Sequence, residues 1–246
     1  MKKILICLLC MFICVLGKAA TETINWRVDG NTYATTTCQT GGDITLPPAP
    51  TKYGYTFQGW VEYVFLEYIE STGTQYIDTG ITFNKDTDYG KIKTKLSIPD
   101  LSTAGYIGAD GNVNILWSGG KMYTGGGSAS SGYSINPDTS YDIQAEIESA
   151  RSNRTITIDN TTLIGTPAVY TTKIAIFGAG GQYGTVINLS KAKVYNFSIY
   201  KNNTLVFNGI PAKNSSNILG MYDTVTDTFF TNAGTGEFIA GPVINQ

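Results

Sequence analysis

The sequence predicts an all-β fold, in which a small module precedes an antiparallel jelly-roll β-sandwich. Apolar and polar residues alternate in short runs, turn-forming pairs separate these runs, and the 246 residues include 28 glycines and 16 tyrosines. No long helical periodicity follows residue 20. Hydrophobic residues make up 42% of the chain, which is enough to fill a core, so we expect a folded protein.

Alternation indicates which side chains of the sandwich face its core. Along residues 91–98, Ile92 and Leu96 share one face while three lysines share the other. Along 195–199, Tyr195 is expected on the same face as the phenylalanine and isoleucine that follow it. Two further runs alternate in the same way, 141–148 and 154–159. One dry and one wet face per strand is typical of antiparallel sheets.

Three pairs of Asn, Asp or Gly residues fall between strand-like runs and predict tight hairpins. They are Asp29-Gly30, Asp159-Asn160 and Asn202-Asn203. These residue types tolerate the positive φ that two-residue hairpin turns require. Many short strands at this spacing are typical of a sandwich or jelly roll.

The first 20 residues have the features of a secretory signal peptide. Two lysines follow the initiator methionine, the stretch 4–16 is continuously apolar, and small residues follow it. This apolar stretch is short for a permanent membrane span, so we expect cleavage near Ala19 or Ala20, with an uncleaved anchor as the alternative. The sequence therefore predicts a secreted or surface-held protein without a membrane span after cleavage.

The composition excludes several kinds of chemistry. The chain contains no histidine, which removes Ser-His-Asp and Cys-His catalysis and His-ligated zinc. Three of the four cysteines lie in the predicted signal peptide, so the exported chain would keep only Cys38 and form no internal disulfide, which favours a bacterial protein. Acidic residues outnumber basic ones, 19 to 17, which argues against a nucleic-acid partner.

The chain divides into three predicted segments. Residues 1–20 form the signal peptide, 21–62 the small module, and 63–246 the sandwich, whose length suits one domain of this type. No Gly/Ser-rich linker separates the last two segments, and residues 61–69 are apolar and strand-like. We therefore expect the two parts to be closely coupled.

A series of motifs in the small module carries a family resemblance. A Gly-rich turn at Gly41-Gly42 and a strand start at Pro47 precede the closing stretch GYTFQGW at 54–60. This order of features resembles the Listeria–Bacteroides repeat, also called the InlB B-repeat. The resemblance implies a small β-grasp-like module of a bacterial surface or secreted protein, usually present in several copies but here in one. Trp26 and Trp60 are expected to pack in its core.

The two ends of the larger segment carry a second resemblance. The stretch LEYIESTGTQYIDTG at 66–80 goes together with LGMYDT at 219–224 and FFTNAGTG at 229–236. These stretches look like the first and last parts of a concanavalin A-like, or laminin-G-like, sandwich. The resemblance implies a jelly roll with a glycan- or protein-binding role. It transfers no ligand, because this fold hosts lectins, hydrolases and adhesins alike.

Glu146 and Glu148 are the nearest approach to a catalytic pair. Their spacing places both carboxylates on one strand face, about 6–7 Å apart, and glycosidases use two carboxylates at about 5–9.5 Å. Concanavalin-type glucanases typically carry E-x-D-x-x-E, whereas here the central residue is Glu148 and the last is Arg151. We therefore expect the two glutamates on a solvated sheet face rather than in catalysis.

Three aspartates are candidate calcium ligands. Asp86, Asp88 and Asp110 lie in turn-rich segments where laminin-G-like domains often bind calcium. Calcium takes six to eight oxygen ligands from carboxylates and carbonyls. The same residue types are also ordinary turn formers, so both interpretations stay open.

Three aromatic residues are candidates for sugar binding. Trp117, Tyr123 and Tyr133 lie in or beside the Gly/Ser-rich stretch 112–132. A flat aromatic face with polar loop groups around it is typical of sugar sites. Trp117 also ends the apolar run 113–116, which would instead place it in the core.

These observations favour a non-enzymatic, adhesin- or lectin-like protein of the bacterial surface or matrix. Its expected partner is a glycan or a surface protein, and calcium is the one cofactor considered. A glycan-cleaving hydrolase and a purely structural surface spacer are the alternatives. The sequence leaves the ligand and the oligomeric state open.

Overall fold

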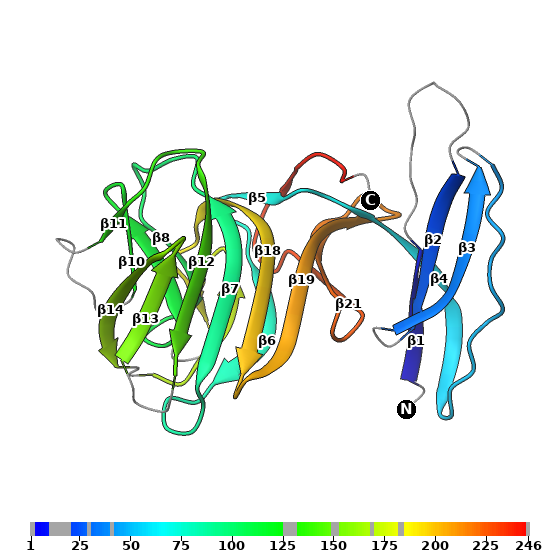
Figure 1. Ribbon diagram of the computed structural model, residues 1–246, viewed down its shortest axis with the longest axis horizontal. Coiled ribbons are helices and arrows are strands. Elements are labelled where there is room, and N and C mark those ends of the chain that lie inside the picture. The colour runs from blue at the N-terminus through cyan, green and yellow to red at the C-terminus, as the bar shows by residue number, and fades with distance from the viewer. Residues whose placement is uncertain are drawn as a thin grey trace.

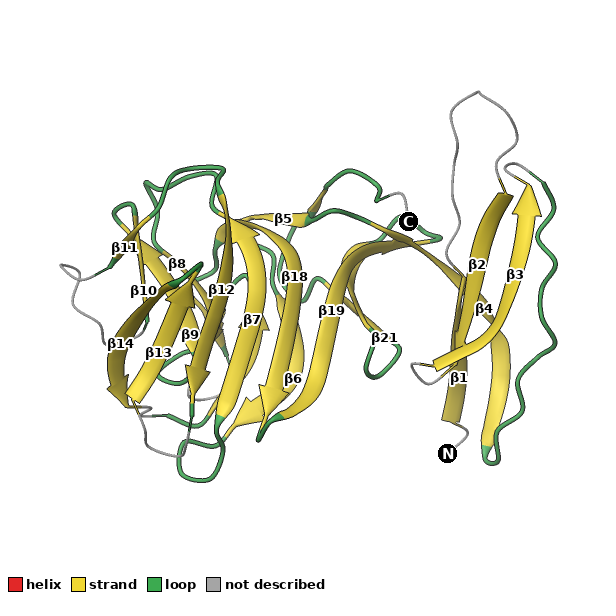
Figure 2. Ribbon diagram, in the orientation of Figure 1, coloured by secondary structure: helices red, strands yellow, loops and turns green. Residues whose placement is uncertain are grey.

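The computed structural model describes residues 3–9, 21–28, 31–39, 42–124, 132–148, 153–167, 170–181 and 185–244. Within these residues every regular element is a strand, which confirms the predicted all-β class (Figure 2). A small sheet stands beside a larger two-layered sandwich, and one strand passes from the first to the second (Figure 1).

The small module is a sheet of four strands. They are β1 (Lys3–Leu9), β2 (Thr21–Val28), β3 (Asn31–Gln39) and the first part of β4 (Tyr55–Phe65). β1 lies between β2 and β4, antiparallel to β2 and parallel to β4. β1 falls inside the predicted signal peptide, whose cleavage stays a prediction. The described residues of the module contain no helix, so the helix of a β-grasp is replaced by the extended segment 42–54.

Two tryptophans form the core of this module, as expected. Trp26 is completely buried, and the centre of its ring lies 4.7 Å from that of Trp60. Ile24 is buried beside them, and Cys38 and Ile44 pack against the pair from β3 and the extended segment. Cys38 is half-buried and has a free thiol.

The front sheet of the sandwich continues from β4. Its strands are β5 (Ile69–Thr72), β7 (Gly90–Ser97), β12 (Ser140–Ile147), β13 (Asn153–Ile158), β14 (Thr161–Pro167), β18 (Lys191–Lys201), β19 (Thr204–Asn214), β20 (Leu219–Asp223), β21 (Thr228–Thr231) and β22 (Ile239–Ala240). The main path runs β14-β13-β12-β7-β18-β19-β4, with every neighbouring pair antiparallel.

The back sheet lies behind it. Its strands are β6 (Ile77–Phe83), β8 (Gly105–Ala109), β9 (Asn114–Ser118), β10 (Lys121–Tyr123), β11 (Tyr133–Ser134), β15 (Thr172–Ile176), β16 (Ala179–Gly180) and β17 (Val186–Ile187). The order is β11-β10-β9-β8-β15-β6, and β16 pairs parallel with β8. The two layers form the predicted sandwich; its concanavalin A-like relationship stays a prediction.

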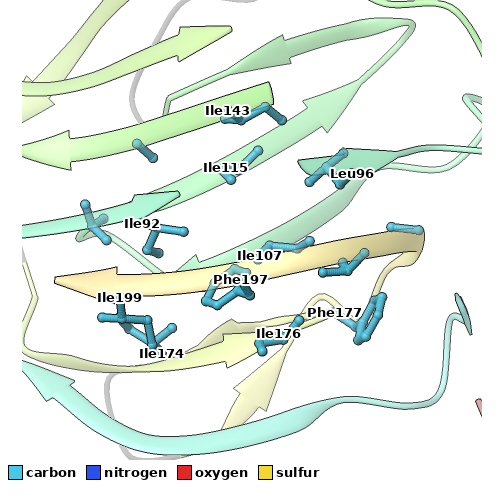
Figure 3. Packing of buried hydrophobic residues seen from close by; sticks show 14 of the residues in the cluster. Ile92, Leu96, Ile107, Ile115, Ile143, Ile174, Ile176, Phe177, Phe197 and Ile199 are labelled. Atoms are coloured by element: carbon cyan, nitrogen blue, oxygen red, sulfur yellow. The ribbon is translucent and has the colours of Figure 1, made fainter. Parts of the chain in front are cut away.

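The core fills the space between the two sheets. Ile92 and Leu96 of β7 and Phe197 of β18 point towards Ile107 and Ile176 of the back sheet (Figure 3). All five side chains are completely buried. The predicted alternation of β7 is therefore confirmed, and its lysines are left on the opposite face.

A β-bulge in β18 overturns one expectation. Val194 pairs with Leu96 but Asn196 pairs with Lys95, so one extra residue enters β18 at this point. Tyr195 and Asn196 consequently both turn away from the core, whereas the sequence predicted Tyr195 beside Phe197. A bulge changes the alternation by one residue, which the polarity pattern alone does not reveal.

The two ends of the sandwich segment meet in space. The backbone N–H of Thr235 donates to the carbonyl of Thr74 at 3.0 Å. The side chain of Asn232 accepts a hydrogen bond from the Tyr76 N–H at 3.2 Å. Gln75 is buried and bonds to neighbouring hydroxyl groups, so this junction is a closely packed part of the fold.

β4 joins the module to the sandwich without a linker. Its first part pairs with β1, and its last residues, Tyr63 to Phe65, pair with Asn214 to Ala212 of β19. The ring of Tyr63 lies 5.1 Å from that of Tyr222 and 4.9 Å from that of Phe229. Burial raises the pKa of Tyr222, a hydrogen bond to Asp227 adds to this, and the positive charge of Arg27 from the module opposes it.

Candidate functional site

The outer face of the front sheet, turned away from the back sheet, carries a hollow at one end of β7, β12 and β18. We call it the first hollow; its volume is about 440 Å³. Two tyrosines, two glutamates, a lysine and an asparagine contribute their side chains: Tyr89, Lys91, Glu146, Glu148, Tyr200 and Asn203. Flat rings therefore stand next to charged and amide groups.

One row of paired residues across the strands forms much of the first hollow. Lys91 of β7 stands opposite Glu146 of β12 on one side and Tyr200 of β18 on the other. The Lys91 ammonium lies 2.9 Å from the Glu146 carboxylate. Because Ile92 is completely buried on the inner face, the pleat directs the Lys91 row outwards.

The hairpin between β18 and β19 positions the rest of the first hollow. Asn202 and Asn203 have positive φ, 49° and 64°, as their sequence predicted. Asn202 exchanges two hydrogen bonds with the backbone of Tyr89, one from its own N–H and one through its side-chain oxygen. The Asn203 amide lies 3.5 Å from the Tyr89 hydroxyl. The turn thus holds Tyr89 at the rim.

The neighbouring loop is fixed by charge. Lys201 lies 2.9 Å from the Asp88 carboxylate, which also accepts the Asn84 backbone N–H at 2.8 Å. Desolvation acts to raise the pKa of Asp88, but these hydrogen bonds and the charge of Lys201 outweigh it, and the pKa is lowered. Asp88 is therefore kept ionised as a loop anchor.

A second hollow of about 410 Å³ lies further along the same face. Its polar side chains come from four strands and one turn: Lys93, Asp142, Gln144, Thr157, Asp159 and Asn196. The Lys93 ammonium lies 5.7 Å from the centre of the Tyr200 ring, so it connects the second hollow with the first.

The predicted sugar-binding aromatics lie on three neighbouring strands, β9, β10 and β11, but they do not form an exposed face together. Trp117 is 1% exposed and packs against Gly105, where a Cβ would lie 2.2 Å from its ring, so it is a core residue and cannot stack on a ligand. Tyr123 is buried as well. Tyr133 is half-buried, and its hydroxyl lies 3.3 Å from Asp159 at the edge of the second hollow. Much of the predicted loop, 125–131, lies outside the described residues.

The three predicted calcium ligands are separate as well. Asp86 pairs with Lys85 at 2.7 Å, Asp88 pairs with Lys201, and the backbone N–H of Asp110 binds the carbonyl of Gly180. Within the part of the chain that the structure describes, no three acidic, histidine or cysteine side chains are placed to hold a metal ion. The calcium interpretation of these aspartates stays a prediction, and their contacts agree with the alternative interpretation as turn residues.

Glu146 and Glu148, in contrast, both line the first hollow. Their expected place on the outer sheet face is where the structure has them. The tyrosines beside them were missed, because the pairing of Tyr200 with Lys91 depends on the register between β18 and β7, which are far apart in the sequence. The pairing of Lys91 with Glu146 was the available signal, since opposite charges often stand across neighbouring strands.

A comparison with known families identifies part of the chain. Residues 23–88 match the Listeria-Bacteroides repeat domain. The repeat is typical of bacterial surface proteins. Its match begins in β2 and extends beyond the predicted boundary at residue 62, through β5 and β6. No curated protein and no solved structure matches the chain.

The repeat carries an open hollow of its own, lined by the segment 49–57. The Lys52 ammonium lies 4.5 Å from the centre of the Tyr55 ring, and Tyr53 is fully exposed. This segment offers fewer polar groups than the outer face of the sandwich.

Among the described residues, no helix is long and apolar enough to span a membrane.

Proposed function

We propose that this chain is a non-enzymatic glycan-binding protein, exported by a bacterium and held at its surface or matrix. The repeat at residues 23–88 supports the location. The first hollow supports the binding role, because it combines two tyrosine rings with carboxylate, ammonium and amide groups on an open face. Sugar sites need both an apolar face and oriented polar groups.

The single observation that carries this proposal is the row formed by Glu146, Lys91 and Tyr200. The ion pair between Glu146 and Lys91 is partly buried, since their side chains are 16% and 32% exposed. It therefore holds a carboxylate and an ammonium in place next to the Tyr200 ring. A ligand hydroxyl can bind both charged groups while the sugar ring stacks on the tyrosine.

A glycan-array screen tests the proposal. Protein expressed from the complete sequence in a bacterial host and purified from its exported fraction is expected to bind a defined group of glycans, with calcium and with chelator alike. Tyr200→Ala should weaken binding about five- to twelvefold, the value of one good ring contact of about 1–1.5 kcal/mol. Tyr53→Ala, at a fully exposed tyrosine outside the sandwich, is the matched control.

Three outcomes of the screen oppose the proposal. Absence of binding to a broad array would favour the structural spacer. Equal loss in Tyr53→Ala would place the glycan on the repeat. Binding that disappears in chelator would require a metal site that the described residues do not show.

A glycan-cleaving hydrolase is the second candidate, because both glutamates line the same hollow. Most glycosidases use a pair of carboxylates that lie on either side of the bond to be cleaved. Release of reducing ends from any bound glycan, abolished in Glu146→Gln and in Glu148→Gln separately, would establish it. Release that persists in both variants would come from a contaminating enzyme.

A further inference from the structure

We infer that the outer face binds an uncharged oligosaccharide chain, several sugar units long, that lies along β7 and β18. This inference rests on the proposed glycan-binding function and names the class of glycan. The first pair of aromatic rings on this face is Tyr89 and Tyr200 of the first hollow. The inference follows from a second pair of rings, from the polar groups between the two pairs, and from the balance of charges on the face.

The second aromatic pair stands at the opposite end of the face from Tyr200. The bulge in β18 turns Tyr195 outwards, and its ring packs at 5.4 Å against that of Tyr68 in an edge-to-face contact. Tyr195 and Tyr200 are separated by four ladder steps once the bulged residue is discounted, about 14 Å at about 3.4 Å per step. This separation exceeds the width of one sugar ring.

Polar side chains fill the space between these two aromatic ends. Lys93 stands opposite Ser198, and Lys95 stands opposite Asn196, the second outward residue of the bulge. The Lys93 row continues to Gln144 of β12. A chain passing between the tyrosines would therefore meet amide, hydroxyl and ammonium groups in succession, which match the hydroxyl groups of a glycan.

Lysines lie over the tyrosine rings at both ends. Lys93 is 5.7 Å from the centre of the Tyr200 ring, and Lys95 is 5.6 Å from that of Tyr195. Both distances are close to the limit of about 6 Å for a cation–π contact. These lysine side chains are on the solvent side of a flat face, so a sugar ring can take their place against the tyrosines.

The charges of the outer face favour an uncharged ligand. Lys91 is paired with Glu146, and Lys193 is paired with Asp138 at 2.8 Å. Acidic and basic groups are mixed along the whole face, because Asp142 stands opposite Lys95. A polyanion would be repelled by the carboxylates, and a polycation would be repelled by the lysines.

The same distribution argues against a protein partner. The centre of a protein–protein interface is usually depleted of charged residues and enriched in apolar ones. The large apolar side chains that are exposed on the front sheet, Ile164, Leu205 and Ile239, lie on β14, β19 and β22 rather than on the strands between the two hollows. The face is therefore too polar for a docking surface of that kind.

Titration calorimetry with chain-length series tests the inference. The probes are cello-, manno-, xylo-, laminari- and chito-oligosaccharides (the last fully N-acetylated), each from disaccharide to hexasaccharide, with oligogalacturonates as acidic controls. For the series that binds, the affinity should rise about tenfold or more from disaccharide to tetrasaccharide and change little beyond.

Two variants separate this inference from the proposed function. Tyr195→Ala should remove the gain with chain length and leave disaccharide binding unchanged, whereas Tyr200→Ala should weaken both. Tyr195→Leu keeps an apolar side chain against Tyr68 and so preserves the packing there. It should lose the gain in affinity with chain length, as Tyr195→Ala does, because the sugar stacks on the aromatic ring. Tyr53→Ala again serves as the control.

Each other outcome overturns a defined statement. Equal affinity for disaccharide and hexasaccharide, with Tyr195→Ala unchanged, would reject the extended chain but keep glycan binding at the first hollow. Preference for oligogalacturonates would reject the uncharged ligand. Absence of binding to every series, together with a negative glycan array, would reject both this inference and the proposed function.

Discussion

The small module, residues 21–62, and the sandwich differ in how their sequences specify a fold. The small module has a small core, in which Trp26 and Ile24 are the buried side chains among the described residues, yet most of it lies within the family match at 23–88. The sandwich has an extensive core between two sheets, and beyond residue 88 no family, curated protein or solved structure matches it. The core of a small module requires a few specific residues, which a family comparison can recognise. The core of a large sandwich requires mainly an alternating polarity pattern, which many different sequences satisfy.

This contrast predicts that the small module is more easily unfolded than the sandwich. Trp26→Ala should cost about 3–5 kcal/mol, the usual range for removing a buried aromatic side chain. The Trp26 and Trp60 rings pack at 4.7 Å in the small core, so the small module should unfold while the sandwich stays folded. Hydrogen exchange measures this: amides of β2 and β3 should exchange rapidly, and those of β7 and β18 should stay protected.

Tyr53→Ala is the control for this experiment, since its side chain is fully exposed and its loss should change neither part. If Trp26→Ala removed protection from β7 and β18 as well, the two parts would form one cooperative unit through β4. The prediction that the small module unfolds by itself would then be wrong.

The core of the sandwich should respond to added volume. A Cβ at Gly105 would lie 2.2 Å from the Trp117 ring, so Gly105→Ala should cost about 1–3 kcal/mol by overpacking. Adding Trp117→Phe should recover part of this loss, because the smaller ring makes room for the methyl group. Thermal unfolding of the two single variants and the double variant measures the coupling. Strictly additive losses would mean that the two sites do not touch.

The smallest effect is expected at Asp88, the last residue of the family match. Its lowered pKa stabilises the fold at pH values above its ordinary value of about 3.9, and this contribution disappears as the pH falls through the lowered value. Asp88→Asn should remove about 1 kcal/mol near neutral pH, because the Lys201 side chain of the pair is 36% exposed and water screens the attraction. The loss should vanish at the lowest pH; a constant loss would indicate a packing defect instead.

Much of the fold followed from the sequence, because strand alternation and turn residues are local signals. Ile92 and Leu96 are buried, and Asn202 and Asn203 adopt the positive φ that the hairpin predicts. Asp29-Gly30 lies outside the described residues, although β2 and β3 pair on either side of it. These outcomes depend on residues near one another in the chain.

The candidate site was harder to predict, since it depends on register between distant strands. Tyr200 meets Lys91 only because β18 and β7 pair with a bulge at Tyr195. Trp117 was predicted as a binding residue from the glycine-rich stretch beside it, but Gly105 of β8, outside that stretch, has no side chain and so admits the indole ring into the core. Polarity patterns do not contain this information, whereas the charges of Lys91 and Glu146 hinted at it.

The continuous strand β4 also sets the orientation of one part against the other. Successive residues of a strand point to opposite sides, so Trp60 and Tyr63, three positions apart, face opposite ways. Trp60 packs in the core of the repeat, and Tyr63 packs against Tyr222 of the sandwich. The same division appears in β2, where Trp26 is buried in the repeat and the charge of Arg27 acts on Tyr222. The order of a few residues in β4 and β2 therefore decides which side chains pack inside the small module and which act on the sandwich, so inserting or deleting one residue there would reverse this assignment.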